Sequence, residues 1–513
     1  MAAESFDIVI VGAGSAGAVI ASRATEDPRP TVCLVEAGPD YPSTADTPYD
    51  LVNSHKNSEI DHDWGFNYQP TRAGASRPFP RGKVTGGSSA VNTTIALRGM
   101  PEDYDYWASL GNAEWSWERV LPAFCRLERD LDYGHLPYHG DSGPITIRRY
   151  RHEELTPVHQ AFLEASKKLG YPDCADANDP ESWGAGPHPM NKLGRVRIST
   201  AVGYLASARI RPNLTIRADT LTRRILLRNG RAVAIEVERD GVVDTIEGRL
   251  IVLCAGALQS PAILMRSGVG AAMELERHGI EVLREVPGIG QNLNDHPALA
   301  TVAKVKDGVP IDADDPIVQT ILRYTAPGSD QRNDLQIEQF SYSPRGGGYQ
   351  HMAIAAVLEQ AYSTGVVRLA SADPYEKPIT EQRMCEDSRD LKRMVACFRD
   401  TLAFLSTEPL ASLIEEVTFP DPQRDLSDDG LEQLVMKLAA SGFHPCGTAK
   451  MGPASDAMAV VDQYGRVHAV ENLVVADASI MPTVPRANTN LTSIMIGEMV
   501  GEWLRTGAGR YGL

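Results

Sequence analysis

The stretch Phe6-Asp-Ile-Val-Ile-Val-Gly-Ala-Gly-Ser-Ala-Gly17 decides the fold of this chain. It begins with a short apolar, β-branched run, which is the composition of a buried parallel strand. Three glycines spaced G-x-G-x-x-G then lead into small residues that open a helix. In such a turn the first glycine permits the tight bend, the second lets backbone N–H groups approach a pyrophosphate, and the third lets helix and strand pack closely. The stretch therefore predicts a Rossmann-type site for a dinucleotide.

An acidic residue ends the next predicted strand. The apolar run Thr31 to Val35 stops at Glu36, about twenty residues beyond the glycines, where a carboxylate typically binds a ribose 2′-hydroxyl. Such a carboxylate argues against a dinucleotide that carries a 2′-phosphate. The alternative is a glycine-rich turn without a ligand, but the flanking strand and helix together with this acid favour dinucleotide binding.

Composition narrows the class of protein. The chain has 513 residues, too many for one core, and its formal net charge of −17 argues against nucleic acid and anionic membranes as partners. No apolar stretch reaches about 18 residues, so we expect no membrane span. Seven scattered cysteines without a C-x-x-C pair indicate reduced thiols. Because the first strand starts near residue 6, we expect no signal peptide and a cytoplasmic location.

The rest of the chain alternates between glycine-rich turns and short strands. Pro80 to Asn92 contains Gly-Gly-Ser-Ser and predicts a backbone loop that lies against a ligand, with a surface turn as the alternative. Residues 213–247 predict a β-meander with a turn at Asn229-Gly230. Residues 298–440 read as a second domain, built on a sheet and inserted before the chain returns at Ser441.

Four histidines are candidate metal ligands. His135, His139, His152 and His159 lack ligand spacing on one face and lie in sequence rich in proline and glycine. We therefore expect them to be solvated loop residues, and we expect no metal.

Taken together, these segments resemble the glucose–methanol–choline oxidoreductases, which are flavin-dependent alcohol oxidases and dehydrogenases. The resemblance covers the whole chain and departs from the family pattern at Thr85, where a larger aliphatic residue is usual. Within the family the chain looks most like bacterial aryl and furfuryl alcohol oxidases. The resemblance is strongest in five blocks, residues 6–38, 80–100, 254–270, 287–296 and 441–499.

The family implies an α/β fold with a Rossmann-type, glutathione-reductase-like FAD-binding domain and a substrate domain built on a six-stranded-type antiparallel sheet. We expect the FAD-binding domain to be discontinuous, comprising residues 1–150, 200–300 and 441–513. The substrate-binding domain would comprise residues 151–199 and 301–440.

The resemblance also implies that the dinucleotide is FAD. In some relatives a histidine one residue before the equivalent of Asn92 carries covalent flavin, but this chain has Val91 there, so we expect non-covalent FAD. The resemblance places Thr222 near the adenine and Asp477 with Ala478 beside the pyrophosphate. The full set of expected cofactor contacts is Gly12, Ala13, Gly14, Ser15, Ala16, Gly17, Glu36, Ala37, Trp64, Arg81, Val84, Gly86, Gly87, Ser88, Asn92, Thr222, Ala255, Gly256, Asp477, Ala478, Asn488 and Thr489.

Alcohol oxidation needs a base near neutral pH, which suits histidine. His444, in the sequence His-Pro-Cys-Gly-Thr, matches the family base, and Asn488 matches its partner, whose amide stabilises developing alkoxide charge. A structural histidine and a helix N-cap are the alternative roles of these two residues. Gly442 and Phe443 are expected to face the substrate, which suits a flat or benzylic alcohol.

The expected reaction is oxidation of a primary alcohol, of aromatic or furfuryl type, to the aldehyde by hydride transfer to flavin N5, with electrons passed to O₂. A dehydrogenase that uses another electron acceptor is the first alternative. The second is a hydroxynitrile-lyase-type enzyme with redox-silent flavin, and the third is a protein that keeps FAD only structurally. The expected partners are a small-molecule alcohol and the acceptor, in a monomer or homodimer.

Overall fold

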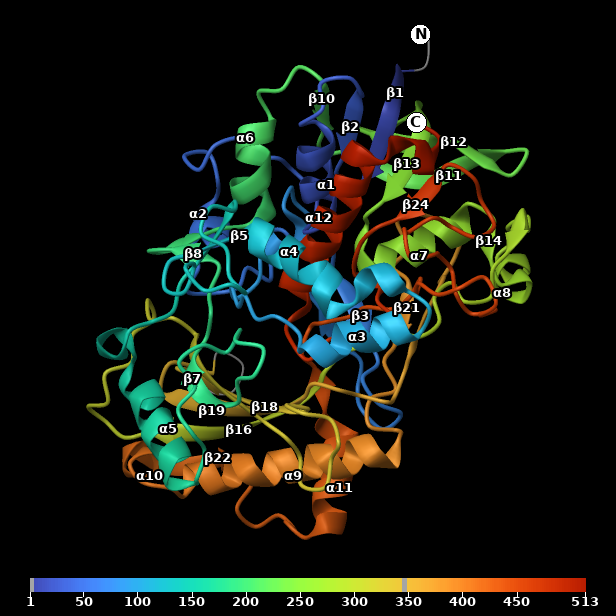
Figure 1. Ribbon diagram of the computed structural model, residues 1–513. Helices are drawn as coiled ribbons and strands as arrows, with labels where there is room; N and C mark the ends of the chain where they lie inside the picture. Colours follow the sequence, from blue (N-terminus) through green and yellow to red (C-terminus); the bar gives the residue numbers. More distant parts are fainter. Residues whose placement is uncertain (1–3, 344–347) are drawn as a thin grey trace.

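A computed structural model describes residues 4–343 and 348–513, and two large sheets organise it (Figure 1). The first is built around β1 (Glu4–Val11), which pairs in parallel with β2 (Val32–Val35) on one side and β13 (Val242–Leu253) on the other. The order along the sheet is β10-β2-β1-β13-β12-β11, and β24 (Leu473–Val475) also pairs with β13. The remaining members are β10 (Leu214–Arg217), β11 (Leu221–Arg228) and β12 (Arg231–Arg239).

The predicted meander is only partly correct. β11, β12 and the first half of β13 form antiparallel pairs, and their turn at Asn229-Gly230 has φ values of 52° and 81°, as a tight hairpin requires. β10, however, joins β2 in parallel at the opposite edge of the sheet. β13 continues without a break beyond the meander, and its second half is the parallel partner of β1.

Two helices cover one face of this sheet around the glycine turn (Figure 1). α1 (Gly17–Ala24) begins at the third glycine and packs against α12 (Thr489–Thr506). A Cβ on Gly17 would lie 1.9 Å from the carbonyl oxygen of Gly12. The close packing expected of the third glycine is therefore confirmed.

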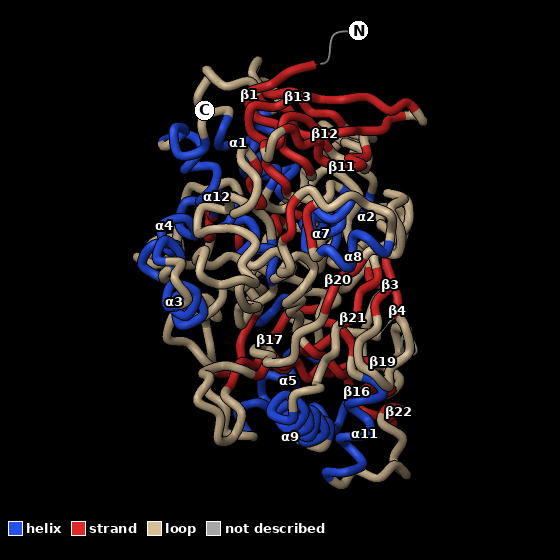
Figure 2. Tube along the Cα trace, turned by 90° about the vertical axis from the view of Figure 1, so that its right-hand side faces the viewer, coloured by secondary structure: helices blue, strands red, loops and turns tan. Residues whose placement is uncertain are grey.

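The second sheet is antiparallel throughout, as the family resemblance implies. Its order is β22-β16-β19-β18-β17-β7, and β23 (Ala440–Ser441) also pairs with β16. Three helices, α5 (Pro157–Lys168), α9 (Ser388–Leu405) and α11 (Asp428–Leu438), pack on the side away from the first sheet (Figures 1 and 2). The other strands of this sheet are β7 (Gly184–Pro187), β16 (Pro297–Val305), β17 (Val318–Tyr324), β18 (Leu335–Phe340), β19 (His351–Leu358) and β22 (Ile414–Phe419).

Smaller elements complete the described chain. Two-stranded pairs are β3 (Phe66–Tyr68) with β4 (Arg77–Phe79), β5 (Glu128–Asp130) with β6 (Ile145–Ile147), β8 (Lys192–Leu193) with β9 (Val196–Arg197), β14 (Val269–Gly270) with β15 (Arg284–Glu285), and β20 (Val366–Arg368) with β21 (Ile379–Glu381). The further helices are α2 (Tyr49–Val52), α3 (Pro101–Ser109), α4 (Trp117–Leu127), α6 (Ala206–Ala208), α7 (Gly256–Arg266), α8 (Ala272–Arg277) and α10 (Leu410–Leu413). Across residues 4–343 and 348–513, no helix combines the length and the apolar character that crossing a membrane requires.

Candidate active site

A cavity of about 1110 Å³ reaches from the glycine turn of the first sheet to the inner face of the second. Most of the residues predicted from the sequence line it, although they come from all parts of the chain. They are Gly12, Gly14, Ser15, Ala16, Glu36, Ala37, Trp64, Arg81, Gly87, Ser88, Asn92, Thr222, Ala255, Gly256, Gly442, Phe443, His444, Asp477, Ala478, Asn488 and Thr489.

Four predicted cofactor contacts lie behind the cavity wall instead, namely Ala13, Gly17, Val84 and Gly86. Their backbones support the lining residues: the Ala13 N–H donates to Glu36 Oε2 at 2.9 Å, and the Gly86 N–H donates to the Ala13 carbonyl at 2.8 Å. Val84 is buried in a small apolar cluster, and Gly17 is the packing contact described above.

The glycine end of the cavity fits a dinucleotide. Gly14 and Gly87 face each other so closely that a Cβ on Gly87 would lie 2.6 Å from the Gly14 Cα, and Gly87 has a φ of +52°. Thr222 Oγ1 and Asn490 Nδ2 belong to lining residues, are buried, and have no hydrogen-bond partner among residues 4–343 and 348–513. Exposed backbone N–H groups can bind a pyrophosphate, and buried polar atoms without a protein partner can bind the nucleosides of a dinucleotide.

Glu36 ties the turn together. Its carboxylate accepts hydrogen bonds from the backbone N–H groups of Ala13 and Gly38, both at 2.9 Å. Burial raises its pKa to about 7, against which these hydrogen bonds act. The acid that the sequence predicts at the ribose therefore also fixes the shape of the glycine loop.

At the other end of the cavity, His444 lies between two side chains. Its Nε2 is 3.0 Å from Asn488 Nδ2, and its Nδ1 is 2.9 Å from His296 Nδ1. The far nitrogen of His296, Nε2, is 3.1 Å from the carbonyl oxygen of Pro485. Asn488 occupies the N-cap position of α12 but makes no side-chain capping bond, because its amide is directed to His444.

These contacts fix the tautomer of His444. A carbonyl only accepts, so His296 carries its proton on Nε2, and its Nδ1 is a bare acceptor in the neutral ring. His444 must then donate from Nδ1 to His296, which leaves its own Nε2 as the unprotonated nitrogen. The lone pair of His444 Nε2 thus accepts from the Asn488 amide at the cavity wall.

Burial keeps both rings neutral. It lowers the pKa of His444 well below the ordinary value, and the neighbouring His296 and Arg81 lower it further. Burial also lowers the pKa of His296 to about 3. A buried neutral imidazole with a defined lone pair is the state that a general base needs before it accepts a proton.

Asp295 holds the loop that carries His444. Its Oδ1 accepts from the backbone N–H of His444 at 2.9 Å and of His296 at 2.7 Å, and its Oδ2 accepts from the Ser441 hydroxyl at 2.5 Å. Phe443 adopts a φ of +66°, a conformation that is strained for a bulky residue, and its carbonyl accepts from Arg81 Nη2 at 2.9 Å. The two histidines are therefore positioned by one carboxylate.

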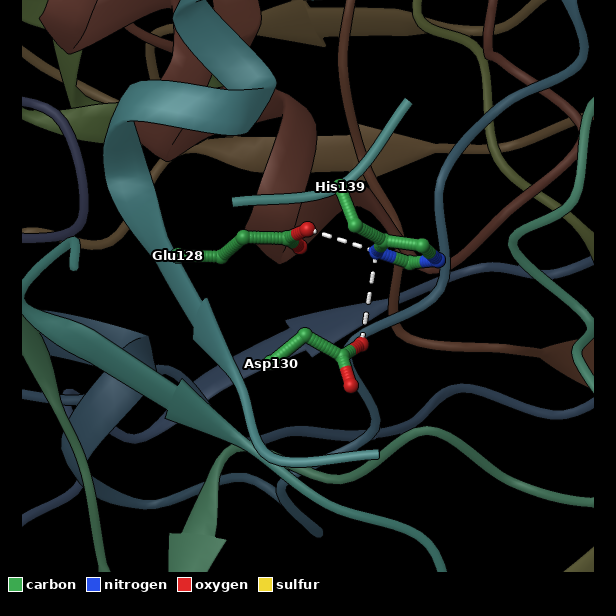
Figure 3. A group of neighbouring side chains, drawn as sticks. All are labelled: Glu128, Asp130 and His139. Atoms are coloured by element: carbon green, nitrogen blue, oxygen red, sulfur yellow. Dashed lines mark hydrogen bonds and ion pairs between the residues drawn. The ribbon is translucent and has the colours of Figure 1, made fainter. Parts of the chain in front are cut away.

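A second histidine cluster corrects a prediction. His139 is buried, with Nδ1 2.6 Å from Glu128 Oε1 and 3.3 Å from Asp130 Oδ2, as Figure 3 shows, and with Nε2 2.8 Å from Asp176 Oδ2. Arg98 and Arg149 reach the same carboxylates, at 2.6 Å to Glu128 and 2.8 Å to Asp130. Because guanidinium groups already occupy these ligand atoms, the cluster is a buried ion-pair network.

His159 is also buried, between the hydroxyls of Thr320 and Ser341 at 2.7 and 3.1 Å. The expectation that His139 and His159 are solvated was wrong, since partners distant in sequence enclose them. Sequence reasoning also missed Asp295 and His296. The block that contains them, residues 287–296, was part of the family pattern, but no chemical role followed from the block itself.

Comparison with known proteins agrees with this geometry. Residues 6–298 match the N-terminal part, and residues 361–497 the C-terminal part, of the family described as GMC oxidoreductase. A 5-(hydroxymethyl)furfural oxidase of Methylovorus sp. (strain MP688) is 34% identical over 548 residues, which cover 98% of this chain and 99% of that protein. An oxygen-dependent choline dehydrogenase 1 of Chromohalobacter salexigens is 35% identical, covering 98% of this chain and 95% of its own.

The fold has solved counterparts as well. The crystal structure of pyridoxine 4-oxidase from Mesorbium loti superposes with a TM-score of 0.90 at 29% identity, over 97% of this chain and 98% of that one. A formate oxidase structure, at 24% identity and a TM-score of 0.89, shares the fold over 99% of both chains. The family matches span most of the chain and include the glycine turn and the loop of His444, so this protein belongs to the GMC oxidoreductase family.

Proposed function

We propose that this protein oxidises a primary alcohol to the aldehyde, with His444 as the base and Asn488 as its partner. The observation that carries the proposal is the tautomer of His444, whose unprotonated Nε2 lies at the cavity wall 3.0 Å from the Asn488 amide. A substrate hydroxyl that replaces this hydrogen bond, and contacts both groups from the cavity, gives its proton to Nε2. The amide then donates a hydrogen bond to the oxygen, where negative charge develops.

FAD is the cofactor of this family, and when bound it accepts the hydride from the alcohol carbon. The glycine turn, Glu36 and the loop of Gly87 would hold its nucleotide end, and α12 begins at the catalytic end with Asn488. We propose that the cofactor is non-covalent, since Val91 stands where a covalent link would need histidine. We also propose that the FAD-binding and substrate-binding domains follow the division expected from the sequence.

The cavity favours a flat alcohol. Phe443 lies 6.1 Å from Phe79, ring centroid to ring centroid, and Trp64 stacks on Phe66, so aromatic surface lines the approach to His444. Furfuryl and benzylic alcohols match this surface. The 5-(hydroxymethyl)furfural oxidase relative supports the same substrate type.

We propose O₂ as the electron acceptor, which the oxidase and the oxygen-dependent relatives support. A dedicated acceptor other than O₂ remains the second candidate. We further propose a cytoplasmic monomer or homodimer, because all seven cysteines are free and six are buried, as suits a reducing compartment.

Anaerobic mixing of the yellow protein with furfuryl alcohol, benzyl alcohol and choline tests this proposal. Loss of the visible flavin absorbance with the first two confirms alcohol oxidation, and rapid recovery on mixing with O₂ identifies an oxidase. Slow recovery in O₂ but fast recovery with a quinone identifies a dehydrogenase. Unchanged absorbance with every alcohol, together with cleavage of a cyanohydrin, would replace the proposal by the lyase reaction.

A further inference from the structure

The cavity extends past His444 over the inner face of the second sheet. Side chains alternate along each strand, and those directed into the cavity from β16 and β19 include Ala298, Ala300, Ala353 and Ala355. The alternate residues, such as Ile354, belong to the core beneath. The floor of the cavity over β16 and β19 is therefore apolar and is formed by short side chains.

The next strand, β18, is different. Gln336, Glu338 and Phe340 face the cavity, while Leu335 and Ile337 enter the core. The register places Glu338 directly opposite Ala355 of β19. The carboxylate of Glu338 therefore extends into the cavity beside the alanine-lined floor.

Glu338 has little compensation within the protein. Its side chain is 12% exposed, and the basic side chain within ion-pair distance in the described part of the chain is His188, whose Nε2 is 3.3 Å from Oε1. The nearby carboxyl of Glu359 interacts with Glu338 as a like charge and so offers no compensation. Glu338 Oε1 and both ring nitrogens of His188 have no hydrogen-bond partner within the portion of the chain that the structure describes. No lysine or arginine nitrogen of the described residues lies within 4.0 Å of the carboxylate.

Two further polar groups on the same wall are partnerless. Gln336 is 2% exposed and Tyr342 is 1% exposed, and neither Gln336 Oε1 nor the Tyr342 hydroxyl has a partner in the described protein. A buried charge or hydrogen-bonding group without a partner is costly, so proteins supply one or leave the position for a ligand. An acceptor-rich wall calls for a ligand that carries donors.

We propose that Glu338 is the specificity group for a protonated nitrogen at the far end of the alcohol substrate. A neutral hydroxyl would satisfy hydrogen bonds but leave the charge, whereas an ammonium group supplies both the charge and several N–H donors. Phe340, on the same face of β18, adds an aromatic neighbour favourable to a cation. This inference rests on the proposed function, because it assigns the second end of the molecule whose hydroxyl meets His444.

The distance across the sheet agrees with two ends of one molecule. The chain passes through Ala440 just before the His444 loop, and the register connects Ala440 to Ala298, Val357 and Gln336 across three strand spacings. Three spacings are roughly 14 Å between Cα atoms. The His444 loop and the strand of Glu338 therefore lie at separate parts of the cavity floor, as two ends of one ligand require.

Matched alcohols test the proposal. 4-(Aminomethyl)benzyl alcohol, its neutral isostere 4-ethylbenzyl alcohol and the anionic 4-(carboxymethyl)benzyl alcohol are compared by the second-order rate constant of anaerobic flavin reduction. We expect the amine to exceed the ethyl compound about tenfold or more in the native holoenzyme, and this ratio to collapse in Glu338→Gln. Glu338→Lys should invert the preference toward the carboxylate, a gain that misfolding does not produce.

Glu415→Gln, which alters an exposed carboxylate on β22, is the matched control and should keep the native ratio. Calorimetry with 4-methylbenzylamine, which has no hydroxyl, separates the two proposals. Binding that weakens about tenfold in Glu338→Gln supports the subsite even if no alcohol reduces the flavin. Amine-to-ethyl rate ratios that agree within about twofold in the native protein, Glu338→Gln and Glu338→Lys would overturn the assignment of Glu338.

Discussion

His296 decides which nitrogen of His444 carries the proton, so its replacement by leucine gives a quantitative prediction. Leucine removes the acceptor 2.9 Å from His444 Nδ1 and leaves that N–H directed at an apolar side chain in the fully buried position of His296. An unsatisfied buried donor costs about 1–3 kcal/mol. This penalty falls on the tautomer that has a free Nε2, and each 1.36 kcal/mol is a factor of ten. We therefore expect flavin reduction to slow about 5- to 150-fold.

The assay is single-turnover flavin reduction under argon, with flavin content and thermal unfolding measured on the same preparations. His296→Gln is the companion variant, because its amide oxygen supplies an acceptor again and should recover part of the rate. A leucine variant that retains full flavin and reduces it within about twofold of the native rate would refute the tautomer argument. An equal loss of the flavin reduction rate in both variants would show that the packing of the His296 ring, and not its hydrogen-bond acceptor, determines the rate.

Three further predictions use other parts of the structure. Because burial lowers the pKa of His444, its imidazole stays neutral below pH 6.5. The rate of flavin reduction should therefore agree within about twofold at pH 6.5 and pH 8 and decline only in more acid solution. A decline centred at pH 6.5 or above would contradict this prediction. Gly87→Ala places a Cβ 2.6 Å from the Gly14 Cα and should abolish FAD retention on gel filtration, and normal flavin content would count against the glycine cradle. Burial opposes protonation of His139, but hydrogen bonds to Asp176 and Glu128 outweigh burial and raise its pKa. The contribution of protonated His139 to the free energy of unfolding is therefore complete below pH 6.5 and is lost as the pH rises through the raised pKa. His139→Leu should cost about 3 kcal/mol in denaturant unfolding at pH 6 and less at alkaline pH, and a pH-independent difference would argue against the charged network.

The nucleotide-binding half was the most predictable part of the fold. Its first strand, glycine turn and helix are local in sequence, and each carries its own signal, so β1 and α1 appear where the pattern indicates. β10 was assigned to the wrong partner because an isolated run of four residues does not say which edge it joins. His139 was misjudged because the loop around it is rich in glycine and proline, while its burial comes from Glu128 and Asp176.

The substrate side was less predictable for a physical reason. Alternation along β18 shows that two faces exist, but only the pairing with β19 and β17 decides which face lines the cavity. Glu338 therefore carries no signal in the sequence that separates it from a solvated charge. His296 was likewise hidden, since its role depends on the carbonyl of Pro485, a residue distant in the chain.

The most direct test of the account compares native protein and His444→Ala in anaerobic reduction of the flavin by furfuryl alcohol, with His152→Ala, an exposed histidine, as the control. We expect bleaching in the native protein and in the control, and a rate about 10²- to 10⁴-fold lower when His444 is absent. A His444→Ala protein that holds its flavin and reduces it within about tenfold of the native rate would contradict the central claim that His444 takes the proton of the alcohol.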